Sequence, residues 1–167
     1  GDPSEVLEHI VEEACSAVKG WRANVVLIDQ SGRPQRLARA GFDTHFDVDT
    51  SIRPSGVSVK VLEQNCPALI EDVQSESERV NPGMIEDGVG AAACLPLHLR
   101  GEVIGVMWVH FKEPRHFSSS ETEALKLYAN QAAIAYDNAR RMRELEHMRS
   151  AAEKLASVAG VREVLQQ

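Results

Sequence analysis

One short stretch of the chain concentrates side chains that can do chemistry: residues 93–117 contain Cys94, His98, His110 and His116. Thiolates and imidazoles ligate metals and haem iron, and a cysteine beside a histidine can act as a nucleophile. A metal site needs these groups close together, because metal bonds to nitrogen or sulfur are only ~2.0–2.3 Å long. The elements that carry the four residues therefore decide which chemistry is available.

Two predicted strands, joined by a tight turn at residues 99–102, carry most of these side chains. Residues along a strand are ~3.3 Å apart, so Cys94 and His98 are separated by about 13 Å, and His110 lies more than ~20 Å from His98. His116 follows in a loop. No metal site is expected from this cluster. We interpret Cys94 as a small core residue, and His98 and His110 as polar groups at strand ends.

The same turn predicts the strand register. Leu95 is expected opposite Val106 on one face, and Cys94 opposite Met107 on the other. Both faces are mostly apolar, which is typical of central strands covered on both sides. The hairpin is therefore predicted to form the middle of a buried sheet.

The remaining elements follow from periodicity and turn signals. We predict a helix over residues 4–19, a hairpin around Ser31-Gly32, a short helix capped by Ser55, and a brief strand over residues 67–73. Residues 74–88 contain turn formers and charges with little apolar periodicity, so we expect a mobile connection without a core element of its own.

A long helix is predicted from residue 118, where Ser118 and Glu121 form a capping box, to about residue 157. At ~1.5 Å per residue it would be some 60 Å long, so its second half must leave the body of the domain. Its apolar residues alternate steps of three and four, a seam expected to pack against a facing helix and to support dimerisation and signalling: Leu125, Tyr128, Ala132, Ala135, Ala139 and Met142.

The chain is expected to divide into a domain over residues 1–147 and an exit or linker helix over residues 148–167. Near the end, REVLQQ echoes the SEVLEHI of residues 4–10, each after a turn-like pair, Ala-Gly or Asp-Pro. The last residues are accordingly predicted to begin a second, similar domain. Chance similarity between two helices is the alternative.

Composition narrows the function classes. The 167 residues are 43% apolar, as in an ordinary globular domain, and the formal net charge of −7 disfavours nucleic acid or an anionic membrane as the partner. Three distant cysteines, Cys15, Cys66 and Cys94, are typical of reduced thiols in the cytoplasm. The sequence has no signal-peptide pattern and no apolar run long enough to span a membrane.

Catalytic motifs are lacking too. The sequence contains no HExxH, CxxC, GxSxG or GxxxxGK pattern and no convincing pair of carboxylates, so no catalytic residue and no metal ligand is assigned. Cys66 precedes Pro67 in a turn without an identified base, and we interpret it as a bystander. The domain itself is therefore expected not to be an enzyme.

Several segments, in order and spacing, resemble the GAF domain, a sensor module of signalling proteins. They are residues 53–59, 67–73, 95–106 and 117–140, and the likeness covers about residues 5–145. The resemblance implies an α+β fold with a central antiparallel sheet of five or six strands. It implies that the N- and C-terminal helices cover one face, that short helices and loops form a pocket on the other, and that the chain forms a homodimer through the terminal helices.

The resemblance leaves the ligand open. Cyclic-nucleotide-binding relatives carry an Asn-Lys-Phe-Asp-Glu signature that has no match here. Bilin-binding relatives attach the chromophore through a cysteine next to a histidine, and no cysteine here has that neighbour. Haem would depend on His45 or His98 alone, and a lone histidine is usually structural. No cofactor is assigned.

The resemblance implies a non-enzymatic sensory or regulatory module that couples a small-ligand pocket to an output domain through the C-terminal helix. By analogy of architecture, the parent would be a histidine kinase of a two-component system. Two alternatives remain: a structural dimerisation or spacer domain without a ligand, and a thiol-based small-molecule reductase, which needs two cooperating cysteines. The expected pocket residues, each of which also has a purely structural interpretation, are Arg53, Ser55, Ser58, Asp72, Met84 and Cys94. Arg53 suits an anionic group.

Overall fold

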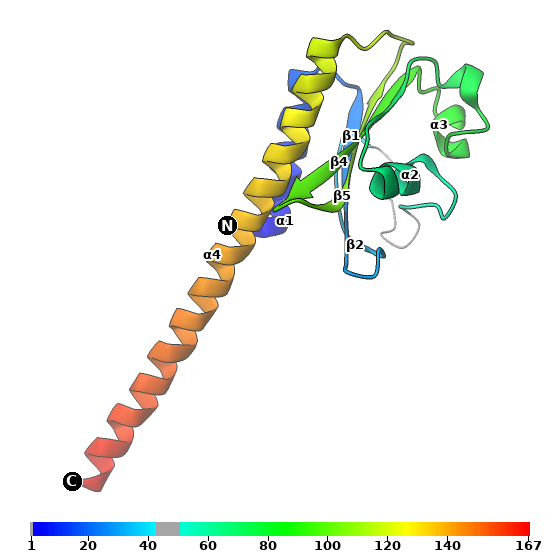
Figure 1. Cartoon of the computed structure of the whole chain (residues 1–167). Coiled ribbons are helices and arrows are strands. Elements are labelled where there is room, and N and C mark those ends of the chain that lie inside the picture. The colour runs from blue at the N-terminus through cyan, green and yellow to red at the C-terminus, as the bar shows by residue number, and fades with distance from the viewer. Residues whose placement is uncertain (1, 43–50) are drawn as a thin grey trace.

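A computed structural model describes residues 2–42 and 51–167 of the chain. Within these ranges the strands form one five-stranded antiparallel sheet in the order β2-β1-β5-β4-β3, as expected (Figure 1). His45, considered above as a haem ligand, lies outside the described residues. The strands are β1 (Arg22–Ile28), β2 (Pro34–Ala40), β3 (Ala68–Ile70), β4 (Ala91–Leu99) and β5 (Glu102–Phe111).

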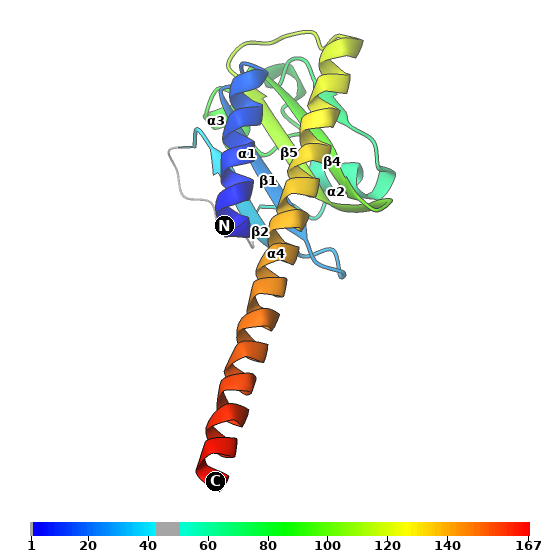
Figure 2. The same cartoon turned by 90° about the vertical axis from the view of Figure 1, so that its left-hand side faces the viewer.

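Helices cover both faces of the sheet, which confirms the predicted α+β arrangement. α1 (Pro3–Ala17) and α4 (Ser119–Gln166) lie side by side on one face (Figure 2). α2 (Val57–Gln64) and α3 (Pro82–Glu86) lie on the other, with a short 3-10 helix at Gln74–Glu76 (Figure 1). The sheet is therefore the middle layer between the helix pair and the short helices.

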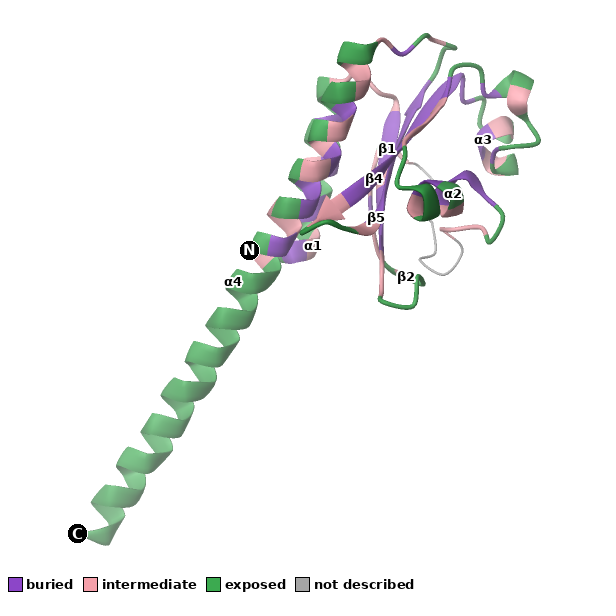
Figure 3. Ribbon diagram, in the orientation of Figure 1, coloured by how far each residue is buried: buried purple, intermediate pink, exposed green. Residues whose placement is uncertain are grey.

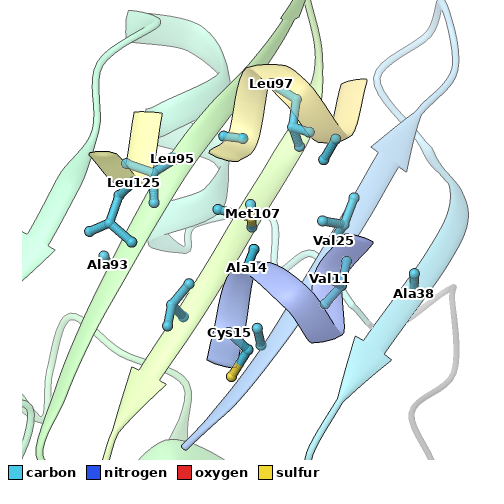
Figure 4. Close-up of a cluster of buried hydrophobic side chains, with 14 of the residues drawn as sticks. Val11, Ala14, Cys15, Val25, Ala38, Ala93, Leu95, Leu97, Met107 and Leu125 are labelled. Carbon is cyan, nitrogen blue, oxygen red and sulfur yellow. The ribbon is translucent and has the colours of Figure 1, made fainter. Parts of the chain in front are cut away.

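The alternating side chains of β4 and β5 supply two separate cores. Leu95, Leu97 and Met107 are fully buried against α1 and α4 (Figure 4). Cys94 and Trp108 belong to the second core, under α2 and α3. The prediction of central strands that are apolar on both faces is confirmed, because neighbouring residues of one strand point to opposite faces and pack in different cores.

The predicted register of this hairpin is wrong by one residue beyond its turn. The turn forms as expected, with Arg100 and Gly101 at φ 51° and 79°, as type I′ hairpins require. A bulge between Leu97 and His98 then shifts the pairing, so that Leu95 pairs with Met107, and Cys94 with Trp108. Such a bulge depends on backbone geometry rather than on apolar alternation, so the alternation could not reveal it.

A close approach of strands accompanies the bulge. Gly105 pairs with Leu97 of β4 and with Leu27 of β1. A Cβ atom at Gly105 would lie 2.2 Å from the carbonyl oxygen of Val26, so only glycine fits there.

The segment 74–88 contradicts the expectation of a connection without a core element. Asn81 caps α3 by accepting a hydrogen bond from the Gly83 amide at 3.0 Å. Val80 and Met84 are buried at 2% and 6% exposure, and Val89 is fully buried. Single apolar residues four and five positions apart anchor one helical turn, and such a pattern is too short to register as periodicity.

Two helix ends also differ from expectation. Gly56, not Ser55, is the N-cap of α2, and it makes no side-chain capping bond. α4 begins after Ser118, whose hydroxyl accepts from the Glu121 amide as predicted, but it runs past residue 157 and through Ala159-Gly160, where a turn was expected.

The second half of α4 leaves the body of the domain, as predicted. Residues 141–167 are exposed along their whole length (Figure 3). The helix has 48 residues, about 72 Å at the usual rise. No break in the helix marks the expected boundary at residue 147, so the start of a second domain stays a prediction. Among the described residues, no helix combines the length and apolarity needed to cross a bilayer.

Candidate functional site

A cavity of about 140 Å³ lies between the sheet and the short helices. β1 and β5 form its floor, α2 and α3 its walls, and the loop before α2 part of its rim. It therefore lies on the face opposite α1 and α4. Side chains from all these elements line it, among them Arg22, Arg53, Ser58, Met84, Trp108 and His110.

The floor holds a buried cation. Arg22 is 5% exposed and pairs across the sheet with His110. Its Nε donates to His110 Nδ1 at 2.8 Å, and its Nη1 donates to Asp87 Oδ2 at 2.8 Å. The guanidinium carbon lies 4.3 Å from the Phe42 ring centre and 4.7 Å from that of Trp21. Asp87 thus compensates the charge of Arg22.

His110 is the neutral partner of this cation. Burial, together with the positive charge of Arg22, lowers the His110 pKa to about 3. Since Nδ1 accepts the bond from Arg22, the ring proton must be on Nε2. His110 lies next to the end of β5, as expected, but it is not a passive polar group, because it is 4% exposed and lines the cavity.

A second hydrogen bond orders the wall beside the floor. Trp108 Nε1 donates to Ser58 Oγ at 2.8 Å, which joins β5 to α2. Cys94 lies beneath this pair and is fully buried. Burial raises the pKa of the Cys94 thiol well above its ordinary value, and a hydrogen bond with Ser58 only partly offsets this. Cys94 is therefore a protonated core residue.

The rim carries two further arginines. Arg79 donates to Glu76 Oε1 at 2.8 Å. Within the described part of the chain, the Arg53 side chain makes no hydrogen bond or ion pair, and it lines the cavity. Gly56 and Val57, at the uncapped start of α2, line it as well, so the positive end of that helix dipole adds to the potential.

The predicted pocket residues divide into two groups. Arg53, Ser58 and Met84 line the cavity. Ser55 and Asp72 are exposed outside it, and Cys94 lies below its wall. That any of the six contacts a ligand stays a prediction. The sequence analysis missed Arg22, Trp108 and His110, although Trp108 and His110 are two apart on one strand and therefore share a face.

The predicted helical seam faces mostly inward. Leu125 and Ala132 are 2% and 0% exposed in the domain's own core, which leaves them no surface for a partner. The facing helix there is α1 of the same chain. Tyr128, Ala135 and Ala139 are half-buried, and Met142 is 63% exposed. The outer face of α4 instead exposes Leu127, Ile134, Leu145, Met148 and Leu155.

Two of the polar contacts between α4 and the rest of the domain lie at Asp137 and His98. Asp137 of α4, 4% exposed, accepts a hydrogen bond from Arg100 of the β4–β5 turn at 2.6 Å and one from Arg140 at 3.0 Å. Burial raises the Asp137 pKa, but these bonds outweigh it, and the pKa is lowered. In the second contact, His98 of β4 bonds to Asn130 of α4 at 3.3 Å and to Asn65, the C-cap of α2.

The described residues offer no other evident chemistry. Among them, no group of three or more histidine, cysteine or acidic side chains could hold a metal ion. No cysteine of the described chain lines the cavity. Cys66 is exposed at the end of α2, while Cys15 is buried on the α1 face.

Comparison with known proteins places these features in a family. The sequence model of one protein family, described as GAF domain, matches residues 1–137 of this chain. A search of curated proteins finds no match. Among solved structures, the GAF domain of an Acinetobacter phosphoenolpyruvate-protein phosphotransferase is similar, with a TM-score of 0.69 and 20% identity over 84% of this chain and 86% of that one.

Two further structures show how widely the fold is used. A domain of a putative two-component sensor histidine kinase from Sinorhizobium meliloti 1021 has a TM-score of 0.66 and 22% identity, over 85% of this chain and 95% of its own. Free methionine-R-sulfoxide reductase from Neisseria meningitidis, solved with its substrate, has a TM-score of 0.66 and 15% identity, over 84% and 81%. At these identities the likeness concerns the fold alone.

Proposed function

Because this chain belongs to the GAF domain family, we propose that it is a non-enzymatic regulatory module of a signal-transduction protein, in which a small ligand in the cavity alters a following output domain through α4. One observation carries the proposal: the cavity and α4 lie on opposite faces of one sheet and share the strand β5, since the cavity rests on β1 and β5 while α4 packs on β4 and β5. A change at one face therefore has a short path to the other.

The path consists of packing and hydrogen bonds. Trp108 contacts the cavity, while its neighbour Met107 packs in the core beneath α4. His98 joins the end of α2 to Asn130 of α4, so a movement of α2 bears directly on the helix. For regulation, the ligand must bind one arrangement of these elements more tightly than the other.

We further propose that a second copy packs against the outer face of α4. Leu127, Ile134, Met148 and Leu155 are separated by 7, 14 and 7 residues, and Leu145 lies three residues before Met148, so all five fit the heptad spacing of a two-stranded coiled coil. In a parallel pair, Glu144 would lie near Arg149 of the second helix, at the flanking positions where opposite charges support pairing. This seam replaces the one expected from sequence, whose Leu125 and Ala132 are buried.

The two alternatives make different demands. A spacer domain needs the fold and dimer but no ligand, and its cavity would stay without one. A sulfoxide reductase needs an accessible thiolate at the cavity. Cys94 is fully buried with a raised pKa, and Cys66 is exposed away from the cavity lining. The geometry therefore favours the regulatory proposal over the reductase.

Two glycine variants test the proposal. In Gly83→Leu, a new side chain on the cavity wall should fill it, since the nearest atom to a Cβ there is Asn81 Oδ1 at 3.5 Å, an ordinary contact. Gly160→Leu makes the same change in the exposed part of α4, where nothing lies within 4 Å. A metabolite screen by melting temperature should find compounds that stabilise the parent chain and Gly160→Leu but not Gly83→Leu.

Hydrogen–deuterium exchange then tests the coupling. Binding should change exchange in α4 between residues 125 and 140 as well as in α2. If no compound in the screen stabilises the protein and native mass spectrometry finds none bound, the spacer alternative is correct. Protection confined to the cavity elements, with α4 unaffected, would contradict transmission through the helix.

A further inference from the structure

The charges of the cavity point to the class of its ligand. Three arginines line it, but two already have carboxylate partners: Arg22 pairs with Asp87, and Arg79 with Glu76. Arg53 is the third, and no acidic side chain of the described residues pairs with it. His110 adds no charge because it is neutral. Among the described residues that line the cavity, one positive charge thus has no carboxylate partner.

The size of the cavity limits the ligand further. Its volume of about 140 Å³ is close to that of engineered cavities of ~150 Å³ that hold one benzene molecule. A nucleotide, a haem or a linear tetrapyrrole is several times larger. The part of a ligand that the cavity encloses therefore has the size of a single ring with one substituent.

The walls are flat and apolar beside the charge. Trp108 and His110 meet edge to face, with ring centres 5.9 Å apart, and Met84, Val57 and Leu37 complete the apolar lining. The Trp108 N–H is already bonded to Ser58, so the indole offers the cavity its ring rather than a donor. Such walls favour an apolar ring next to the charged group.

We propose that the cavity binds a small apolar monocarboxylate of about the size of benzoate, with Arg53 pairing to the carboxylate and the ring against Trp108 and Met84. This rests on the proposed function, since it requires the cavity to be the ligand site. Arginine matches a carboxylate through two parallel hydrogen bonds. A single charge in the ligand matches the single uncompensated charge of the site. The dipole of α2 adds to the attraction but does not define the site.

The test compares benzoate with benzamide, which has the same shape without the charge. Titration calorimetry on the full chain should show saturable benzoate binding, with benzamide at least about tenfold weaker, as expected for loss of a charge-assisted pair. Arg53→Gln should weaken benzoate to the level of benzamide. Arg162→Gln, a matched change in the exposed tail of α4, should leave the affinity within about twofold.

A folding control keeps the result interpretable. Circular dichroism melting of Arg53→Gln without ligand should match the parent chain, because the Arg53 side chain makes no hydrogen bond or ion pair with the described residues, and its backbone bond to the Gly56 amide does not depend on the side chain. If it does not, Arg53→Lys takes its place; it keeps the charge but loses the paired geometry and should bind benzoate several-fold more weakly.

The outcomes separate this inference from the proposed function. Equal affinity of Arg53→Gln and the parent chain for benzoate, or equal binding of benzoate and benzamide, would overturn the inference. If neither probe binds while other compounds stabilise the parent and not Gly83→Leu, the ligand class is wrong and the regulatory role stands. If nothing binds, both fail.

Discussion

Acidification should destabilise this domain through His110 in a way that can be isolated. In the folded chain His110 is buried against Arg22, and its pKa is about 3, whereas the ordinary value is 6.5. Between these two values the unfolded chain binds a proton at this histidine and the folded chain does not. Lowering the pH therefore favours unfolding. The contribution of His110 to the free energy of unfolding is constant above pH 6.5 and becomes less favourable to the folded state as the pH falls below that value.

The size of the effect follows from linkage. One proton difference costs about 1.4 kcal/mol per pH unit. From pH 7 to pH 4.5 only the part below 6.5 counts, two units, so the free energy of unfolding should fall by about 3 kcal/mol on account of His110 alone. This window lies above the folded pKa, so the value is insensitive to the exact position of that pKa.

The variant His110→Asn isolates the contribution of His110 to the pH dependence of stability. The asparagine amide oxygen can accept the hydrogen bond from Arg22 in place of Nδ1, and the amide group does not titrate. Urea unfolding at fixed protein concentration, from pH 7 to 4.5, gives the stability of each chain. The parent chain should lose about 3 kcal/mol more than His110→Asn over this range. His147→Asn, in the exposed part of α4, should follow the parent. Parallel curves for the parent and His110→Asn would refute a buried neutral imidazole.

Three further changes test other parts of the structure. Asp137→Asn should lower the free energy of unfolding by about 1–2 kcal/mol in urea titrations, since it weakens three arginine contacts that are partly screened by solvent. An unchanged free energy of unfolding would mean that these contacts do not stabilise the fold. Leu145→Glu should dissociate the dimer proposed through the outer face of α4, as measured by sedimentation velocity, whereas His147→Glu, on the other side of the helix, should not. Dissociation by both variants would mean that the interface lies elsewhere. Ellman's reagent should modify one thiol per native chain, Cys66, and the two buried cysteines only on unfolding; rapid reaction of all three would contradict the burial of Cys94.

Local patterns were sufficient for most elements of the fold. The apolar residues on both faces of β4 and β5 predicted central strands, and the capping box at Ser118 predicted the start of α4, because both signals are confined to a few residues. The register failed where it depended on a bulge. The bulge lies beside the close contact of Gly105 with β1, a strand some 80 positions earlier in the sequence, and no local pattern contains that contact.

The candidate site was less predictable because it is assembled from distant residues. Arg53 and Ser58 were found through family-like motifs next to a short helix. Arg22 and His110 were missed because each is an isolated polar residue at the end of an apolar strand, and only their pairing across 88 positions explains their burial. The predicted seam of α4 has the facing helix that was expected, but this helix is α1 of the same chain. Two apolar stripes run along α4, and sequence alone does not say which one faces the sheet.

The size of the proposed ligand bears on the need for a dimer. Moving a two-state equilibrium from 1:99 to 99:1 requires about 5.5 kcal/mol of differential binding. That is most of the free energy available to a ligand with a micromolar dissociation constant, about 8 kcal/mol, and a benzoate-sized molecule would have to bind one state almost exclusively. If two chains switch together through paired α4 helices, each cavity need contribute only about 2.8 kcal/mol, roughly a hundredfold preference.

The dimer seam at Leu145 and Met148 would then be part of the sensing mechanism, and Leu145→Glu should reduce the exchange response of α4 to ligand while leaving binding at the cavity intact. A monomeric variant whose α4 still responds in full would show that one cavity is enough.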